Sequence, residues 1–378
     1  MMKGKENMLN IQKFCAENEN WRELLKKAPY FLKIQESEEP GWENLVLFKY
    51  DQIHSDFSEP ICRECRGLIL EKGTWKVVRM AFTKFFNYGE SNADEIDWDS
   101  ATATSKEDGS LISLYNYDGV WRVASNGNMC AGWAPLDNGG YKTFRDLFEA
   151  ALVKYNVDVE SLDPRYTYTF ELCSQFNMIV CKYDEIQLFL TCVRNNETLK
   201  EVDVEIEGVP RPQFYALNSR EEYEALVENL GENREGIVVK DKFNRRVKMK
   251  TLLYFQLHRM AGNGNLSLVQ AVELILANDT EEFLSYFPQY TEYMNKIKIA
   301  IEEGFATANL VNETVREWKL TNTIEEPKAA RAEFAKFVKG KSFAPLFFVA
   351  YDDRDVMDYV KSLNAKKLIN FFKLYDYE

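Results

Sequence analysis

Histidine is almost absent from this chain of 378 residues, which contains only His54 and His258. Catalytic sites that pair histidine with serine, cysteine or a metal ion therefore have almost no residues to draw on. The single Cys62-Arg63-Glu64-Cys65 segment lacks the second pair of cysteines or histidines that a zinc site needs. Any chemistry must rest on lysine, arginine and carboxylate side chains.

Long apolar runs and regularly spaced cysteines are also missing. No run approaches the roughly 18 residues of a membrane-spanning helix, and residues 1–10 lack the apolar segment of a signal peptide. Seven cysteines, an odd number at irregular spacings, indicate reduced thiols and not a disulfide framework. We therefore expect a cytoplasmic protein that has no membrane partner.

An excess of positive charge is lacking as well, because the net charge is −13. This balance argues against a uniformly basic surface for nucleic acid, although an enzyme needs only a local basic groove. One candidate groove lies in residues 240–250, which contain Lys240, Lys242, Arg245, Arg246, Lys248 and Lys250. The alternative for this run is a solvated basic hairpin.

The length suits two domains, and the residue pattern changes after about Tyr254. Residues 1–60 form a mixed lead-in, with helical periodicity over residues 10–27 and a strand over residues 45–50. Residues 62–250 are mostly strand-like, with a helical insert near residues 141–155, which indicates an α+β domain with antiparallel sheets. Helical spacing is expected over residues 266–277, 280–287, 292–318, 324–338 and 355–372, with a turn at Gly262-Asn263-Gly264-Asn265.

Lys106-Glu107-Asp108-Gly109-Ser110 is the most informative segment of the chain. Residues 111–117 and 120–125 read as strands joined by a two-residue Asp118-Gly119 turn, so Lys106 is expected at the mouth of a β-hairpin. A lysine beside an acid and a tight turn can be presented as a nucleophile to a nucleotide phosphate. The alternative is a solvated turn lysine.

Two later strands carry further charged residues. Alternation over residues 166–173 puts Glu171 on a polar strand face with Thr167 and Thr169, and Glu235 precedes Gly236 and an apolar strand. Arg246, Lys248 and Lys250 share one face of the strand that follows. Three cations in a row suit a triphosphate.

Six segments in this order resemble the motifs of the covalent nucleotidyltransferases, which include ATP-dependent ligases and capping enzymes. Within this superfamily the chain resembles the phage-type RNA ligases of the tRNA-repair class over roughly residues 60–255. The segments are Glu64-Cys65-Arg66-Gly67-Leu68-Ile69, Lys84-Phe85-Phe86-Asn87, Lys106 to Ser110, Phe170-Glu171, Glu235-Gly236-Ile237-Val238-Val239-Lys240 and Val247-Lys248-Met249-Lys250. The resemblance implies a nucleotidyltransferase (adenylation) domain over residues 1–254 and leaves residues 255–378 as an all-α domain with a candidate role in RNA specificity.

The resemblance also implies roles for single residues. Lys106 is the expected nucleophile that forms lysyl-AMP, and Lys250 is the expected catalytic partner at the α-phosphate. The nucleotide-binding residues are expected to be Arg66, Lys84, Lys106, Gly109, Glu171, Lys248 and Lys250, and the metal ligands Glu171, Glu235 and Asp108. ATP and Mg²⁺ are the implied cofactors, with Mn²⁺ as a substitute. Because a free lysine has a pKa near ~10.4, we expect Lys248, Lys250 and a bound magnesium ion together to lower the pKa of Lys106.

These residues predict an ATP-dependent RNA ligase that joins 5′-phosphate and 3′-hydroxyl ends through lysyl-AMP and RNA-adenylate, in RNA or tRNA repair. A nicked tRNA anticodon loop is one candidate substrate; no obligatory protein partner is evident, and a phage-encoded enzyme would act in the host cytoplasm. The alternatives are a DNA ligase, a capping guanylyltransferase or a non-catalytic nucleic-acid-binding protein. The first two add an OB barrel after the last lysine motif, where this chain reads as helical. The third would be expected to have lost Lys106, Glu171, Glu235 or Lys250.

One segment departs from the family pattern. Similar ligases carry Lys or Arg near a Ser-x-Gly, whereas this chain has Ser125-Asn126-Gly127. A phosphate or ribose contact is either missing at Asn126 or supplied from elsewhere. In the helical region a basic run could meet backbone phosphates or form a solvated helix face; it comprises Lys328, Arg331, Lys336, Lys339 and Lys341.

Overall fold

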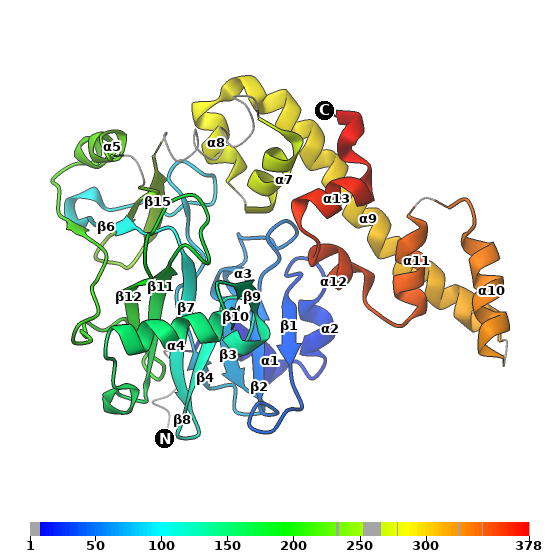
Figure 1. Ribbon diagram of the computed structural model, residues 1–378, viewed down its shortest axis with the longest axis horizontal. Coiled ribbons are helices and arrows are strands. Elements are labelled where there is room, and N and C mark those ends of the chain that lie inside the picture. The colour runs from blue at the N-terminus through cyan, green and yellow to red at the C-terminus, as the bar shows by residue number, and fades with distance from the viewer. Residues whose placement is uncertain are drawn as a thin grey trace. The chain divides into compact units, whose positions relative to one another are not determined.

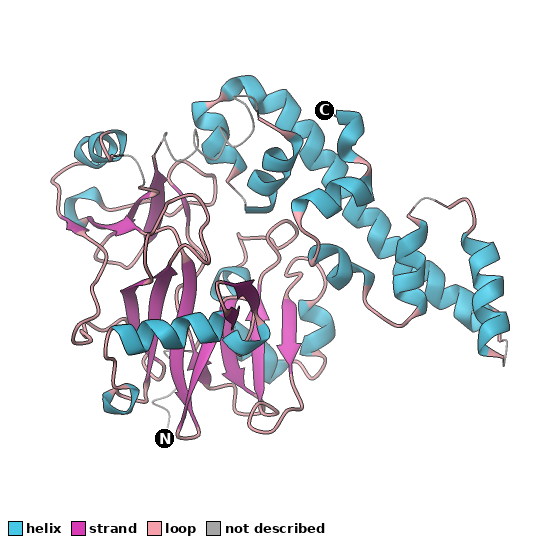
Figure 2. Cartoon of the chain, viewed as in Figure 1, coloured by secondary structure: helices cyan, strands magenta, loops and turns pink. Residues whose placement is uncertain are grey.

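The chain forms two compact units, residues 1–257 and residues 258–378. The computed structural model describes residues 8–231, 234–251, 266–277, 279–323, 326–341 and 343–377. The sequence predicts a boundary after residue 254, and the turn expected at residues 262–265 lies outside the described residues. Figures 1 and 2 show a first unit rich in strands and a second unit made of helices. The mixed α/β class with a helical C-terminal region is therefore confirmed.

An antiparallel sheet with the strand order β1-β2-β3-β4 forms the first layer of unit 1. Its strands are β1 (Lys33–Glu36), β2 (Leu45–Lys49), β3 (Arg66–Glu71) and β4 (Val77–Arg79), and the helices packed nearby are α1 (Asn10–Glu17), α2 (Trp21–Leu25) and α3 (Pro60–Glu64). The Glu64 carboxylate accepts hydrogen bonds from the backbone amides of Asn10 (3.0 Å) and Ile11 (2.9 Å). Glu64 therefore satisfies donors at the start of α1, which favours an acid there.

The second sheet, also antiparallel, has the order β12-β11-β7-β8. Its strands are β7 (Ser110–Tyr117), β8 (Val120–Ser125), β11 (Tyr166–Cys173) and β12 (Gln187–Asn195). The hairpin predicted between β7 and β8 is confirmed, and Asp118 and Gly119 have φ values of 54° and 74°, as a turn of this kind needs. A small hairpin, β9 (Pro135–Asn138) and β10 (Tyr141–Thr143), leads into α4 (Phe144–Lys154).

Helix α4 covers one face of the second sheet (Figure 1). It begins with a capping box, in which Thr143 Oγ1 accepts from the Asp146 amide and the Asp146 carboxylate accepts from the Thr143 amide. Leu147 and Phe148 pack with Phe170 of β11 in a buried apolar cluster. The opposite face of β11 is also interior, since Thr167 and Thr169 are fully buried. The polar face predicted for this strand therefore lies inside the protein and not toward solvent.

The third sheet has the order β13-β6-β14-β15-β5. Its strands are β5 (Phe86–Asn87), β6 (Thr102–Lys106), β13 (Phe214–Tyr215), β14 (Gly236–Lys240) and β15 (Arg246–Lys250), and α5 (Arg220–Glu228) precedes β14. β15 pairs with β5 in the parallel direction, so this sheet is mixed, whereas the other strand pairs of the described residues are antiparallel as predicted. Tyr223 of α5 is fully buried and donates to the Ala101 carbonyl at 2.7 Å, which fixes the helix against β6.

Register in the third sheet brings distant segments together. Gly236 of β14 is paired with Lys106 of β6 on one side and with Lys250 of β15 on the other. Neighbouring strands lie about 4.8 Å apart, so residues more than 140 positions apart in sequence meet within two strand spacings. This row across three strands is the base of the candidate site.

Unit 2 consists of packed helices in its described part (Figure 2). They are α7 (Leu268–Ala277), α8 (Thr280–Tyr286), α9 (Thr291–Thr321), α10 (Pro327–Val338), α11 (Ala344–Tyr351), α12 (Val356–Lys361) and α13 (Ala365–Phe372). Trp318 of α9 packs edge-on against Phe334 of α10, with ring centroids 4.9 Å apart. The sequence missed α11, whose Pro345 lies in the first turn, where proline is tolerated. The predicted helix over residues 355–372 is two helices, because Asn364 caps a new start at α13.

None of the helices in the described ranges has both the length and the apolar character that crossing a membrane would require.

Candidate active site

Lys106 lies at the end of β6 and forms an ion pair with Glu235. Its Nζ is 2.6 Å from Glu235 Oε2, while the Nζ of Lys250 is 3.6 Å from Glu235 Oε1. Glu235 and Lys250 are each 4% exposed, whereas Lys106 is 23% exposed. A single buried carboxylate thus bridges two lysines from different strands and leaves the first of them within reach of solvent.

Two glycines allow this close approach. A Cβ atom on Gly236, which has φ +157°, would lie 2.0 Å from the Met249 carbonyl oxygen, and one on Gly109 would lie 2.4 Å from the Leu172 carbonyl oxygen. Both distances are far below van der Waals contact, so neither position tolerates a side chain without a backbone shift. Because Gly109 has no side chain, the turn after Lys106 can lie in contact with the end of β11, the strand that carries Glu171.

The electrostatics of Lys106 differ from the expectation. Burial acts to lower the pKa of Lys106, and Lys250 acts in the same direction, but attraction to the carboxylates of Glu235 and Glu171 outweighs both and raises the pKa. Lys250 therefore acts in the predicted direction, but in the protein without nucleotide or metal ion the two carboxylates have the larger effect on the pKa of Lys106. Lys106 is a protonated ammonium until the charge around Glu235 changes.

A cavity of about 640 Å³ opens beside Lys106, and residues of the second and third sheets line it. Arg66, Glu171 and Lys248 line it together with Lys106. Burial raises the pKa of Glu171 to about 7, an effect that Glu235 and Asp108 reinforce and Lys106 opposes. The Nη1 atom of Arg66 is buried and has no hydrogen-bond partner among the described residues. An unsatisfied guanidinium suits an anionic ligand, because such donors are costly to leave unpaired.

The fit to a magnesium ion depends on Glu171. Within the described part of the chain no donor hydrogen-bonds its carboxylate, and there is no group of three or more His, Cys, Asp or Glu side chains that could hold a metal. Mg²⁺ is commonly held by one or two carboxylates together with substrate phosphates and water, so this donor set is compatible with it. The described residues do not provide a metal site made of protein ligands alone.

Asp108 has a different set of contacts. Its Oδ2 atom accepts from the backbone amides of Val180 (2.8 Å) and Cys181 (2.7 Å), and its own amide donates to Tyr183 Oη at 3.1 Å. Tyr183 Oη also donates to Glu107 Oε2 at 3.3 Å. The turn after Lys106 is thus bound to the loop between β11 and β12, a link that the sequence did not indicate. The metal assignment of Asp108 stays a prediction.

Lys84 does not line the cavity of Lys106. It is 7% exposed, and its Nζ lies 5.2–5.3 Å from the ring centres of Tyr50, Phe57 and Phe86. Phe86 is a core residue, whereas Phe85 is half-buried and lines the cavity. The structure therefore separates two adjacent aromatic residues that the sequence could not distinguish, and the phosphate role of Lys84 stays a prediction.

A buried arginine stands beside Asn126, where similar ligases carry a cation. Arg79 is fully buried, and its Nη2 atom donates to Ser113 Oγ at 2.7 Å and to Asn126 Oδ1 at 3.4 Å. Burial lowers the pKa of Arg79 to about 10, so the guanidinium remains charged at neutral pH. Positive charge is present at this point of the fold, supplied by β4 and not by residue 126.

Sequence reasoning also missed several residues around the cavity. Phe82, Glu201 and Arg211 line it, and Arg194 pairs with Glu201. They come from segments with no motif of their own, so only the register of the strands could have revealed them.

A lysine held beside a carboxylate, a second lysine and a cavity with an unsatisfied arginine has the features of a covalent nucleotidyltransferase site. The sequence comparisons narrow this class, since a family model of RNA ligases matches residues 64–258. The chain belongs to this RNA ligase family, and the predicted membership of a phage-type RNA ligase group is confirmed.

Two relatives and one solved structure are similar to this chain over 68–75% of its length. An RNA ligase of Rhodothermus phage RM378 is 26% identical over 322 residues, covering 68% of this chain and 72% of the relative. A protein of Autographa californica nuclear polyhedrosis virus, whose assigned name is bifunctional polynucleotide kinase/RNA ligase, is 30% identical over 298 residues. That match covers 74% of this chain but only 42% of the relative, so the chain spans less than half of it. An archaeal ATP-dependent RNA ligase structure aligns over 75% of this chain and 78% of its own, at 12% identity and a TM-score of 0.43.

Proposed function

We propose that the protein is an ATP-dependent RNA ligase that joins a 5′-phosphate end to a 3′-hydroxyl end. The observation that carries the proposal is the contact of Lys106 with Glu235 and of Glu235 with Lys250, at the edge of a cavity large enough for a nucleotide. The family match supports it independently. We further propose that the substrate is a nicked tRNA and that unit 2 determines which RNA is sealed.

The first step is attack of the Lys106 amine on the α-phosphorus of ATP. The N–P bond forms, the bond from the α-phosphorus to the bridging oxygen breaks, and pyrophosphate leaves. Because Glu235 Oε2 lies 2.6 Å from Nζ, Glu235 is the group placed to accept the ammonium proton. Lys250 offsets the negative charge that builds up on the α-phosphate.

The remaining steps follow from the same groups. AMP passes from Lys106 to the RNA 5′-phosphate, which restores the lysine, and the 3′-hydroxyl then displaces AMP to form the phosphodiester bond. Arg66, Lys248 and Glu171 line the cavity in which these phosphates would sit. Glu171, with Glu235 nearby, would hold magnesium, which supplies charge neutralisation to the phosphates when it is bound.

The test is covalent labelling of the purified chain with ATP labelled at the α-phosphate, in the presence of magnesium. The expected product is label that survives denaturing electrophoresis at alkaline pH and is released by acid, as a P–N bond requires. Chase with unlabelled 5′-phosphate RNA should move the label to the RNA and then release it as AMP. No label with ATP, or label only with GTP, would contradict the proposal.

A further inference from the structure

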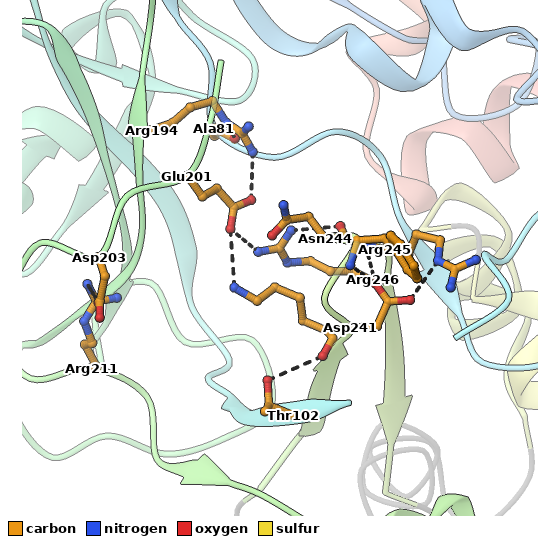
Figure 3. A network of polar contacts seen from close by, with 12 residues as sticks. Ala81, Thr102, Arg194, Glu201, Asp203, Arg211, Asp241, Asn244, Arg245 and Arg246 are labelled. Carbon is orange, nitrogen blue, oxygen red and sulfur yellow. Dashed lines mark hydrogen bonds and ion pairs between the residues drawn. The ribbon is translucent and has the colours of Figure 1, made fainter. Parts of the chain in front are cut away.

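A cluster of charges lies at the far end of the Lys106 cavity. Glu201 accepts from Arg194 Nη2 at 2.9 Å and from Arg246 Nη2 at 2.5 Å, and Lys240 Nζ is 3.6 Å away. Figure 3 shows Arg194 and Arg246 both pointing toward Glu201. Three cations therefore meet one carboxylate. Burial opposes ionisation of Glu201, but Arg246, Arg194 and Lys240 lower its pKa below the usual value.

This cluster and the ion pair of Lys106 with Glu235 lie near opposite ends of β15. Arg246 and Lys250 lie on one face of the strand, four residues and about 13 Å apart at the usual rise per residue. The phosphates of one triphosphate are joined by single bridging oxygens and span less than this. Arg246 also pairs with Glu201 at 2.5 Å, so its charge is directed toward this cluster and not toward Lys248 and Lys250.

Arg194 is fixed by the fold, whereas Lys240 and Arg246 line the cavity. Arg194 donates to the carbonyls of Ala81 (2.9 Å) and Leu199 (2.6 Å) as well as to Glu201. Lys240 is 41% exposed. Glu201 thus acts as a positioning residue that holds the cavity-lining cations in place without neutralising all of them.

Two half-buried aromatic rings line the same cavity. Phe82 and Phe85 meet edge to face with centroids 5.9 Å apart. The guanidinium of Arg246 lies 5.2 Å from the Phe82 ring, and that of Arg66 lies 5.4 Å from the Phe85 ring. Aromatic rings beside cations are the combination that binds single-stranded RNA, because bases stack on the rings and phosphates meet the cations.

We propose that Lys240, Arg246 and Phe82 form a subsite for the nucleotides that follow the 5′-phosphate of the RNA strand. The inference rests on the proposed ligase function. The terminal phosphate would lie at the Lys106 end, and the strand would run along β15 toward Glu201. Phe82 would stack a base, and Lys240 and Arg246 would contact backbone phosphates.

The experiment compares binding of a fluorescent single-stranded RNA with a 5′-phosphate and binding of ATP, for the full chain and its variants. We expect Phe82→Ala to weaken RNA binding about 10-fold or more, the scale of one lost base–aromatic stack, and Arg246→Gln to weaken it through the loss of a phosphate contact. Lys240→Gln should reduce the slope of log affinity against log salt by about 0.7, as expected for one lost contact to a single strand. The ATP affinity of all three should change much less.

Lys242→Gln is the matched control. Lys242 is 58% exposed, pairs with Asp97 at 2.7 Å and does not line the cavity. The substitution therefore removes one positive charge two residues from Lys240 but outside the cavity. If Arg246→Gln alone unfolds the protein, the double variant Glu201→Gln/Arg246→Gln also removes the carboxylate that would have lost this partner. Phe82→Leu is the milder variant if Phe82→Ala unfolds.

The outcomes separate this inference from the proposed function. Normal RNA binding in folded Phe82 and Lys240 variants would overturn the subsite while the wild-type chain still forms lysyl-AMP. An equal loss of ATP and RNA affinity would also overturn it, because the cluster would then belong to the ATP site. A wild-type chain that never forms lysyl-AMP would contradict the ligase function itself.

Discussion

Lys106 is paired with a buried carboxylate, as a structural lysine often is, and it is also exposed to the cavity, as a nucleophile must be. It is buried enough to pair with Glu235, yet 23% of its side chain remains exposed at the cavity. We expect Lys106→Ala and Lys106→Arg to abolish lysyl-AMP formation, since neither offers a neutral amine at neutral pH. Labelling with α-labelled ATP measures this, and retained label in Lys106→Ala would show that the nucleophile is elsewhere.

Lys250 Nζ lies 3.6 Å from Glu235 Oε1, and the proposed mechanism gives both residues a role in the first step. We expect Glu235→Ala and Lys250→Ala each to slow lysyl-AMP formation at least ~100-fold, as when one preorganised group is removed from a transition state. Single-turnover labelling at saturating ATP is the measurement. Rates near the wild-type value in both variants would contradict the assignment.

Glu201 should give the protein a pH-dependent contribution to stability. Its pKa is lower in the folded chain than the ordinary 4.5, so its stabilising effect is present above about pH 4.5 and is lost as the pH falls through the lower folded-state value. We therefore expect Glu201→Gln to reduce the free energy of unfolding near pH 7 but to approach wild type in acid. Urea denaturation at several pH values measures the difference, and a gap that grows in acid would contradict it.

The sequence predicted which residues lie together where a motif carried them, and their chemical roles stay predictions. Lys106, Glu235 and Lys250 come from short segments with distinctive neighbours, and they do meet. Glu201 and Arg79 could not be predicted, because each is one charged residue in an ordinary strand or loop, and its role depends on which strand lies opposite. The raised pKa of Lys106 was missed for a similar reason, since only the structure shows that the Glu235 carboxylate lies 2.6 Å from Lys106 Nζ.

Among the elements, the turn at residues 106–110 depends on Gly109. We expect Gly109→Ala to destabilise the fold by about 1–3 kcal/mol, the usual cost of overpacking, because the new Cβ would lie 2.4 Å from the Leu172 carbonyl. Thermal unfolding measures the loss. The control is Gly231→Ala, because a Cβ atom on Gly231 would meet open space and its φ is not positive. Gly73→Ala is less suitable, because Gly73 has a positive φ.

The strands and long helices were predictable because their periodicity is local. The β7–β8 hairpin was predicted from the Asp118-Gly119 turn, and α9 was predicted from the spacing of its apolar residues. The parallel pairing of β15 with the two-residue strand β5 was not predictable, because so short a segment has no period. β14 pairs with one edge of β15, and β5 pairs with the other.

At the scale of the whole chain, the matched family region ends at residue 258 and the second compact unit begins there. We expect a folded truncation after residue 257 to retain lysyl-AMP formation but to change which RNA is sealed. The measurement compares sealing of a nicked anticodon stem-loop with sealing of an unstructured strand. Equal loss on both RNAs, or complete loss of lysyl-AMP, would contradict this division.

The basic run in unit 2 offers less free charge than its sequence implied. Arg331 pairs with Asp352 at 2.5 Å, and Lys336 pairs with Glu333 at 2.8 Å. Both pairs are solvent-exposed and weak, so phosphates could compete for these cations. We therefore expect any contribution of these cations to RNA binding to depend strongly on salt.

All seven cysteines, spread through unit 1, are buried and unpaired. Burial raises the pKa of several of these thiols, including Cys15, Cys62 and Cys181, to about 12. Maleimide dyes react with exposed thiolates, so the natural protein should take up little label without any cysteine being removed. One cysteine introduced on each unit would then carry a donor and an acceptor, and energy transfer between them would follow the two units through each step of sealing.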